Sequence, residues 1–289
     1  MALKAMRAAV SVAALVGAAA VGVPAQLLAL KAGFGKGGVI PLLFHRYALG
    51  VVGVRRRVIG RPAAARPLLI TANHASWLDI VVLGAIAPVS FVAKSEIADW
   101  PLFGLLSKLQ RSIFVDRSRR TATRAVSREM AERMTSGHPV VLFGEGTSSD
   151  GNRVLPFRSA LLGAAGKAIA EGGAEAVYVQ PVSIAYTHRN GLPLGLRTRP
   201  AIAWYGDIEI LPHMWSILRD GAIDVTVTFG EPIRVDGATD RKAVARQAER
   251  EVRRMTAEAL RGGAREIAQP EPAPEDPDVA LATQPSPSA

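Results

Sequence analysis

The longest apolar run of the chain lies near its N-terminus. Residues 8–30 carry no charged side chain and are rich in Ala, Val and Gly. A helix of this length can cross a hydrocarbon core about 30 Å thick, so we expect a membrane-anchoring helical segment within residues 1–36. A cleaved signal peptide is the alternative, because Lys4 and Arg7 precede the run, although the run exceeds the usual signal-peptide core of about 7–15 residues.

Residues 37–60 mix apolar and basic positions. Two apolar runs, 39–44 and 47–54, are separated by a His-Arg pair and followed by three consecutive arginines at 55–57. Long basic side chains can lie at the level of lipid headgroups while their apolar neighbours reach below them. We therefore interpret 37–60 as an interfacial basic and apolar segment. The alternative is an apolar helix packed on the domain that follows.

From residue 61 to residue 238, short apolar runs alternate with segments of helical length. Strands are predicted at 68–71, 89–92, 113–115, 140–143, 177–184, 201–205 and 225–229. Helices are predicted at 76–86, 101–109, 121–135 and 159–170. This alternation predicts an α/β fold with a mixed, largely parallel sheet flanked by helices.

The end of the chain divides into a charged segment and a polar tail. Residues 239–264 have helical spacing and finish in two glycines, so we predict a C-terminal helix there. Residues 265–289 are rich in Pro, Glu, Ser and Ala, which cannot bury a core, and we expect this tail to be disordered.

The charge balance points to an anionic membrane surface. The formal net charge is +10, aromatic residues make up 6% of the chain, and no nucleic-acid-binding motif is present, so we expect no nucleic acid partner. A basic surface beside an apolar anchor suits anionic lipid. The heavier basic cluster follows the apolar run, and this favours an inner-membrane protein whose main domain lies on the cytoplasmic side.

The chain has no cysteine, which excludes disulfides, thiolate nucleophiles and cysteine-bound metals. Apart from His74, the four histidines show no metal-ligand spacing with one another or with acidic residues. We therefore expect no metal site.

The candidate chemistry begins with His74 and Asp79, which follow the first strand-like run of the main domain. A neutral imidazole can take a proton from an alcohol, and a nearby carboxylate can fix its tautomer. A second polar cluster, 144–147, follows the strand-like run 139–143, and open α/β sheets build sites where strands end. The alternative is that Asp79 only caps the helix, because Ser76 and Asp79 have capping-box spacing.

Four motifs in order resemble the glycerolipid acyltransferase family, whose best-known members are 1-acylglycerol-3-phosphate O-acyltransferases. They are Asn73-His-x4-Asp79, Ile113-Phe-Val-Asp-Arg117, Phe143-Gly-Glu-Gly-Thr147 and Val179-Gln-Pro-Val182. The resemblance covers roughly residues 58–233 and implies that 61–238 is an acyltransferase catalytic domain. It also implies transfer of a fatty acyl group from an acyl-carrier-protein or coenzyme A thioester to the hydroxyl of a lysolipid, without a cofactor.

The resemblance assigns roles to individual residues. His74 is implied as the general base on the acceptor hydroxyl and Asp79 as its orienting partner, a serine-protease logic in which the substrate supplies the nucleophile. Arg117 is implied to bind the anionic head of the acceptor. Glu145, Gly146 and Thr147 are implied to shape the acceptor pocket.

Two positions depart from the family's usual third motif, Phe-Pro-Glu-Gly-Thr-Arg. Gly144 stands where the proline is common, and Ser148 stands where the arginine is common. Arg153 and Arg158 lie just downstream, and we include Arg158 among the substrate-binding candidates. The Ser-Ser-Asp-Gly continuation also resembles the branch that acylates lyso-ornithine lipids, whose headgroup carries a carboxylate and no phosphate.

We therefore predict a lysophospholipid O-acyltransferase that makes phosphatidic acid from a 1-acylglycerol-3-phosphate. A lyso-ornithine lipid O-acyltransferase is the close alternative. Two further alternatives are a non-catalytic protein that binds membranes or lipid, and a thioesterase-like hydrolase that delivers water in place of the lipid hydroxyl.

Overall fold

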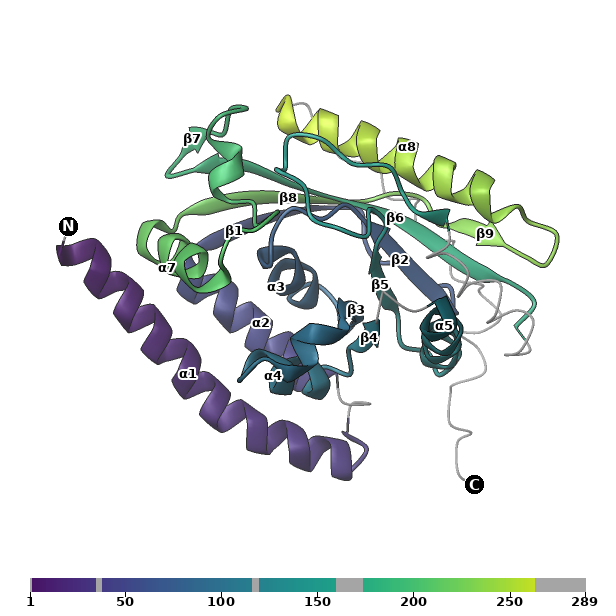
Figure 1. The fold of residues 1–289 in the computed structure, drawn as a ribbon, viewed down its shortest axis with the longest axis horizontal. Coiled ribbons are helices and arrows are strands. Elements are labelled where there is room, and N and C mark those ends of the chain that lie inside the picture. The colour runs from purple at the N-terminus through teal and green to yellow at the C-terminus, as the bar shows by residue number, and fades with distance from the viewer. Residues whose placement is uncertain (1, 35–37, 116–119, 160–173, 263–289) are drawn as a thin grey trace, which may run out of the picture.

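The computed structural model describes residues 2–34, 38–115, 120–159 and 174–262. At its centre is a mixed nine-stranded sheet in the order β1-β8-β6-β2-β5-β3-β4, with β7 and β9 both paired to β6 (Figure 1). The strands are β1 Val54–Ile59, β2 Leu68–Ala72, β3 Ser90–Lys94, β4 Ile113–Val115, β5 Val140–Phe143, β6 Val177–Arg189, β7 Leu192–Pro193, β8 Ile223–Phe229 and β9 Ile233–Val235. The α-helices are α1 Ala2–Lys31, α2 Val39–Val52, α3 Leu78–Gly84, α4 Phe103–Leu109, α5 Arg120–Thr135, α7 Ile210–Asp220 and α8 Arg241–Leu260. The predicted α/β class, with a largely parallel sheet between helices, is confirmed.

The strand β2 shows how the sequence produces this layered arrangement. All five of its residues are buried, as expected for a parallel strand covered on both faces. Leu68 and Ile70 point into the core shared with α2, α3 and α7, whereas Leu69 points into the core shared with α5 and α8. Side chains alternate between the two faces of a strand, so one short apolar run serves both cores. Because it is buried on both faces, β2 is a central strand of the sheet. It therefore gives the residues that follow Ala72 a fixed starting position.

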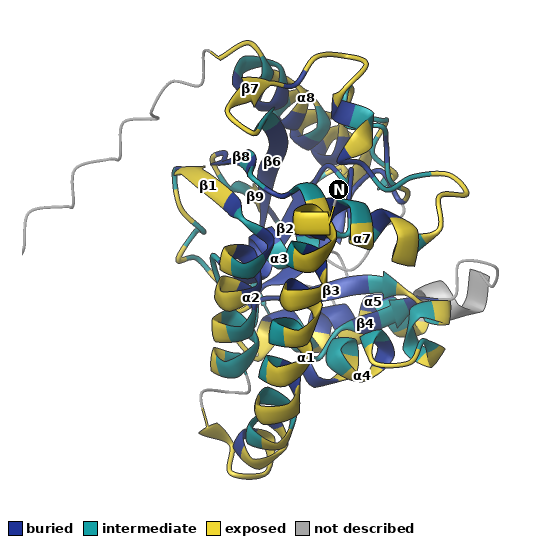
Figure 2. Cartoon of the chain, turned by 90° about the vertical axis from the view of Figure 1, so that its left-hand side faces the viewer, coloured by how far each residue is buried: buried dark blue, intermediate teal, exposed yellow. Residues whose placement is uncertain are grey.

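The helix α1 lies along the body of the protein (Figures 1 and 2). Near one end, the Arg7 guanidinium donates to the carbonyl oxygens of Leu218 and, at 2.9 Å, of Val52. Near the other end, Gln26 Nε2 donates to the carbonyl oxygen of Leu109 at 2.8 Å. By length and composition, α1 is the one helix among the described residues that is suited to cross a membrane. Its outward side is largely exposed and apolar, which agrees with the predicted membrane anchor.

Residues 54–59, interpreted above as part of an interfacial segment, form β1 at the edge of the sheet. This strand pairs in parallel with β8, so the sheet begins before residue 61. Its two end residues are buried and the arginines 55–57 are exposed. Charged side chains on an edge strand discourage pairing with other chains, which explains a basic run inside a strand. The apolar stretch before it forms α2, which packs against α1 and α3.

The predicted strand at 201–205 is wrong. Arg199–Ala201 is a short 3-10 helix, and Ile202 and Ala203 are buried by packing without pairing to a strand. The sequence interpretation also missed α7, in which Pro212 occupies the first turn, where a helix tolerates proline. The C-terminal helix is present as α8, while most of the predicted helix at 159–170 and the whole tail at 265–289 lie outside the described residues.

Candidate active site

His74 and Asp79 form a hydrogen-bonded pair between β2 and α3. His74 lies two residues beyond the end of β2, and Asp79 lies in the first turn of α3. His74 Nδ1 is 2.8 Å from Asp79 Oδ2. The same oxygen accepts the backbone N–H groups of Ala75 at 2.7 Å and Ser76 at 2.9 Å. Asp79 therefore satisfies backbone N–H groups in the turn before α3 and also holds the imidazole.

The second oxygen of Asp79 is bound by a residue that the sequence interpretation missed. Tyr186 Oη, on β6, donates to Asp79 Oδ1 at 2.6 Å, and Asp79 is fully buried. Burial, with the Asp79 carboxylate beside it, holds the pKa of Tyr186 well above its ordinary value, so the phenol keeps its proton and donates. The only sequence signal for this contact is the period of β6, which turns Val182, Ile184 and Tyr186 to the same buried face.

These contacts leave one ring nitrogen of His74 available for chemistry. When Nδ1–H donates to the carboxylate, the neutral imidazole carries its lone pair on Nε2. No described residue forms a hydrogen bond to Nε2, and the His74 side chain is 17% exposed. The ring stacks on Phe143, with centroids 3.9 Å apart and planes 15° apart, which fixes its orientation. The arrangement suits a base that takes a proton from an alcohol approaching from outside.

Glu145 holds the backbone on which His74 sits. Its Oε2 accepts the His74 backbone N–H at 2.8 Å, and its Oε1 accepts the Leu155 backbone N–H at 2.6 Å. Burial raises the pKa of Glu145 to about 7, and the two N–H donors oppose this rise. Both carboxylate oxygens face backbone donors, so Glu145 contributes to the site by fixing the loop that carries the base.

The loop after β5 wraps around His74. The Ser149 backbone N–H donates to the His74 carbonyl oxygen at 2.8 Å, and Ser149 Oγ approaches the same oxygen at 3.2 Å. Gly146 has a φ of +68°, a conformation that favours glycine at this turn. Thr147 is exposed beside it. The structure thus brings His74, Asp79, Glu145 and this glycine turn together, as the motif spacing predicted.

Of the two arginines predicted to bind substrate, Arg158 lies within the described residues. The backbone N–H of Arg158 donates to the Gly144 carbonyl oxygen at 2.8 Å, so Arg158 lies against the loop after β5 with its side chain exposed. Arg153, also exposed, lies on the same stretch. Arg117 lies outside the described residues.

The glycine at position 144 has a clear local reason. A Cβ placed there would lie 2.5 Å from Cδ2 of the Phe157 ring, well inside van der Waals contact. The aromatic ring occupies the space that a proline or other side chain would need. The position of the Phe157 ring therefore explains why this chain has glycine at 144, where the family commonly has proline.

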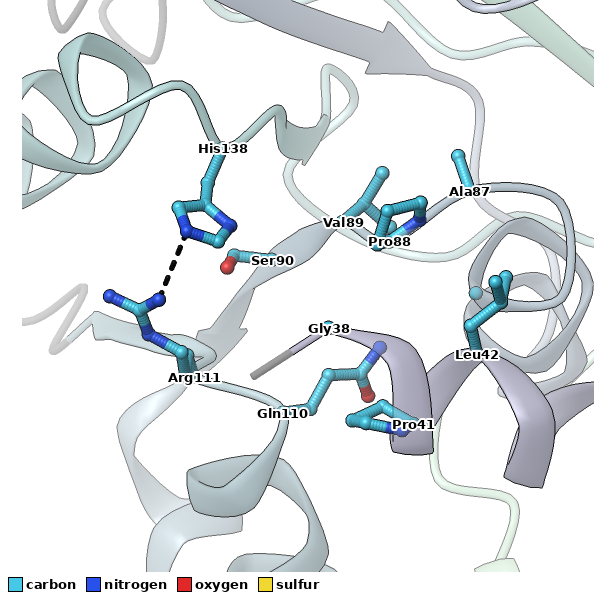
Figure 3. A pocket seen from close by; sticks show the side chains of 11 residues that line it. Gly38, Pro41, Leu42, Ala87, Pro88, Val89, Ser90, Gln110, Arg111 and His138 are labelled. Carbon is cyan, nitrogen blue, oxygen red and sulfur yellow. Dashed lines mark hydrogen bonds between the residues drawn. The ribbon is translucent and has the colours of Figure 1, made fainter. Parts of the chain in front are cut away.

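One cavity lies near the amino ends of three strands, β3, β4 and β5 (Figure 3). Ser90 begins β3, His138 precedes β5, and Arg111 precedes β4, so these lining residues mark the amino ends of their strands. His74, in contrast, follows the carboxyl end of β2. Arg111 and His138 are hydrogen-bonded to each other at 3.1 Å across this cavity. Within the described part of the chain, no group of three or more His, Cys, Asp or Glu side chains is placed to hold a metal ion.

Comparisons with known proteins agree on one family. The Acyltransferase family matches residues 55–185. A lyso-ornithine lipid O-acyltransferase of Brucella abortus is 51% identical over 83% of this chain and 90% of its own length. A protein of the same name from Rhizobium meliloti is 44% identical over 87% of this chain and 86% of its own length.

More distant similarities extend to enzymes of phosphatidic acid synthesis. A 1-acyl-sn-glycerol-3-phosphate acyltransferase of Neisseria gonorrhoeae is 31% identical over 69% of this chain and 74% of its own length. The crystal structure of the 1-acyl-sn-glycerophosphate acyltransferase of Thermotoga maritima has the same fold, with a TM-score of 0.60 and 22% sequence identity. That similarity covers 89% of this chain and 97% of the solved one.

Proposed function

Because this chain belongs to the acyltransferase family and acts on lysolipids, we propose that its acceptor is the free hydroxyl of a lyso-ornithine lipid, with 1-acylglycerol-3-phosphate as the second candidate. The acyl donor is an acyl-carrier-protein or coenzyme A thioester. The observation that carries this proposal is the dyad, in which Asp79 holds Nδ1 of His74 and leaves Nε2 for the substrate.

The geometry supports a single-displacement reaction without an acyl-enzyme. His74 Nε2 takes the proton of the acceptor hydroxyl as its oxygen attacks the thioester carbonyl carbon. The tetrahedral intermediate collapses, the C–S bond breaks, and the imidazolium returns its proton to the departing thiolate. Asp79 holds the ring in the orientation and tautomer that the reaction needs, and it stabilises the imidazolium. The thioester is already activated, so this route needs positioning and a base and no metal or redox cofactor.

The choice of acceptor rests on similarity and on the loop after β5. The sequence alone places lysophosphatidate first, whereas two relatives at 51% and 44% identity are lyso-ornithine lipid O-acyltransferases. Ser148 replaces an arginine common in the family, which reduces the positive charge available for a phosphate. Arg158, exposed beside Gly144, is our candidate for the carboxylate of the acceptor, together with Arg117. Lysophosphatidate remains the second candidate acceptor, because a relative that is 31% identical is a 1-acyl-sn-glycerol-3-phosphate acyltransferase.

The protein is membrane-associated, and we propose the inner membrane with the catalytic domain on the cytoplasmic side. The apolar, exposed side of α1 supports burial in lipid, and the basic residues that follow it favour the cytoplasmic side. Acyl thioesters are also made and kept in the cytoplasm, so this side gives access to the donor.

The test is acyl transfer by the purified chain in vesicles. Each acceptor is offered with each thioester, and the two-chain lipid product is measured by mass spectrometry. A higher kcat/KM for the lyso-ornithine lipid supports the proposal, and a higher value for lysophosphatidate reverses the order of the two acceptors. Release of free fatty acid without an acceptor would identify a hydrolase. Absence of thioester consumption under all conditions would indicate a non-catalytic lipid-binding protein.

A further inference from the structure

The outer face of α7 carries an apolar patch. Leu211 is 67% exposed and Trp215 is 40% exposed, one helical turn apart on the same side, and Ile208 just before the helix is 39% exposed. We call these three residues the α7 patch. Neighbouring large apolar side chains left in water are uncommon on a soluble surface and mark a contact with a partner or a membrane.

The inner face of α7 fixes which way the patch points. Ile217 is buried in the core, on the opposite side of the helix from Leu211, and His213 Nδ1 on that side accepts the indole N–H of Trp77 at 3.1 Å. Trp77 lies two residues before Asp79 in the catalytic motif. The helix is therefore anchored to the loop of the dyad by one side and cannot turn the patch inward.

The helix that carries the patch packs against α1. The Arg7 guanidinium donates to the Leu218 carbonyl oxygen, and Lys4 pairs with Asp220 at 3.5 Å, so the N-terminal part of α1 lies against the end of α7. Figures 1 and 2 show the two helices side by side. On the outward side of this part of α1, Leu3 and Val10 are exposed. A bilayer that receives α1 therefore also reaches α7.

The charges at this junction suit anionic lipid headgroups. At the C-terminal end of α7, Asp220 is surrounded by the cations Lys4, Arg189 and Arg219, which leaves this end with net positive charge. At the other end, the exposed acids Asp207 and Glu209 flank Ile208, so the basic charge lies on the side of the patch nearer α1. Basic side chains beside an apolar patch favour anionic lipid, and tryptophan favours the boundary between headgroups and acyl chains. Both features point to a lipid surface as the occupant.

We propose that the α7 patch inserts into the same bilayer as α1, which makes α7 a second lipid-contacting element directly attached to the catalytic motif. This inference rests on the membrane association of the protein and not on the identity of the acceptor. Its test therefore uses binding and leaves acyl transfer aside.

The absence of cysteine allows the test by site-specific labelling. The full chain carries single substitutions Leu211→Cys or Trp215→Cys, each coupled to an environment-sensitive fluorophore, and is mixed with phosphatidylethanolamine–phosphatidylglycerol vesicles. Leu27→Cys on the exposed side of α1 is the positive control, and Leu192→Cys, 70% exposed on β7, is the negative control. We expect emission at 211 and 215 to shift to shorter wavelength with vesicles, as at 27, and emission at 192 to stay unchanged.

Two results would overturn the proposal. One is a shift at residue 27 with none at 211 or 215. The other is a shift at 211 and 215 that appears without vesicles and grows with protein concentration, which would identify a second copy of the chain as the occupant.

A pair of double variants measures the contribution to binding. Leu211→Ser with Trp215→Ser should weaken vesicle affinity roughly tenfold or more, because two large apolar side chains lose burial in lipid. Leu192→Ser with Leu196→Ser removes two leucines that are 70% and 73% exposed and should leave affinity unchanged. Equal affinity for the two double variants would contradict the proposal. Circular dichroism of both confirms that the fold is kept.

Discussion

Tyr186 donates a 2.6 Å hydrogen bond from its phenol to Oδ1 of Asp79, across 107 residues of sequence. The contact joins β6 to the first turn of α3 and occupies the carboxylate oxygen that His74 does not use. A hydrogen bond in a buried site is electrostatically strong, so this one fixes the angle at which Asp79 meets the imidazole. Three residues are therefore linked in series: Tyr186 positions the Asp79 carboxylate, and this carboxylate positions the His74 imidazole.

Replacing Tyr186 with Phe should lower kcat roughly tenfold, because a hydrogen bond to a charged group contributes about 1.5–3 kcal/mol. The KM values should change little, because the buried phenol contacts Asp79 and acts on the substrate only through the dyad. Tyr178→Phe in the same strand is the matched control. A fall in kcat of the same size in Tyr178→Phe would limit Tyr186 to a packing role.

Replacing Asp79 with Asn should reduce kcat by about 10⁴-fold, the size of effect known for the orienting aspartate of a serine-protease triad. The two carboxylate oxygens of Asp79 accept hydrogen bonds from His74, two backbone N–H groups and the Tyr186 phenol. An asparagine amide has only one oxygen to accept them. It also cannot stabilise an imidazolium by charge. Single-turnover kinetics measure the chemical step. Asp236→Asn, distant from the dyad in sequence and half-exposed, should behave as the unmodified protein, and comparable loss in both variants would count against the assignment.

Replacing Glu145 with Gln should change how stability depends on pH. Burial raises the pKa of Glu145 from 4.5 to about 7 in the folded protein, so the folded state holds this proton more tightly than the unfolded state. The resulting stabilisation is complete below pH 4.5 and is lost as pH rises through about 7. We expect the stability difference between the unmodified chain and Glu145→Gln to shrink over this range, by up to about 3 kcal/mol.

Thermal and denaturant unfolding at several pH values measures this difference. At every pH the variant should also be less stable, because an amide offers one oxygen to the two backbone N–H groups of His74 and Leu155. Glu231→Gln, at an exposed position, is the control. A difference independent of pH would contradict the raised pKa.

Replacing Gly144 with Ala should destabilise the protein by about 1–3 kcal/mol, the usual range for overpacking. The added Cβ meets the Phe157 ring at 2.5 Å. Adding Phe157→Ala should recover part of this loss, and a double-mutant cycle in denaturant measures the coupling. Additive effects of the two substitutions would show that the ring is not what requires glycine there.

Much of the site could be predicted from the sequence because its parts lie at strand ends. His74 and Glu145 each follow an apolar run, and parallel neighbouring strands bring such positions together. Tyr186 could not be predicted, since its contact with Asp79 depends on the register of β6 against β2 and on the angle of α3. Sequence period gives the face on which a side chain lies and not the partner it meets.

The errors in the fold have similar causes. β1 carries three exposed arginines, so its pattern resembles a basic interfacial segment, and only its pairing with β8 makes it a strand. Residues 201–205 are apolar because Ile202 and Ala203 fill the core beside α7. In both cases, contacts with distant parts of the chain determined the local structure, and the local sequence pattern did not.

The most direct test of the role of His74 is acyl transfer by His74→Ala compared with His188→Ala in the same vesicles. We expect no two-chain lipid product above background for His74→Ala, with an unchanged fold and unchanged vesicle binding. We expect normal product formation for His188→Ala, on the β6 hairpin beyond the dyad. Product formation by His74→Ala at the rate of His188→Ala would contradict the role of His74 as the base, and with it the proposed mechanism.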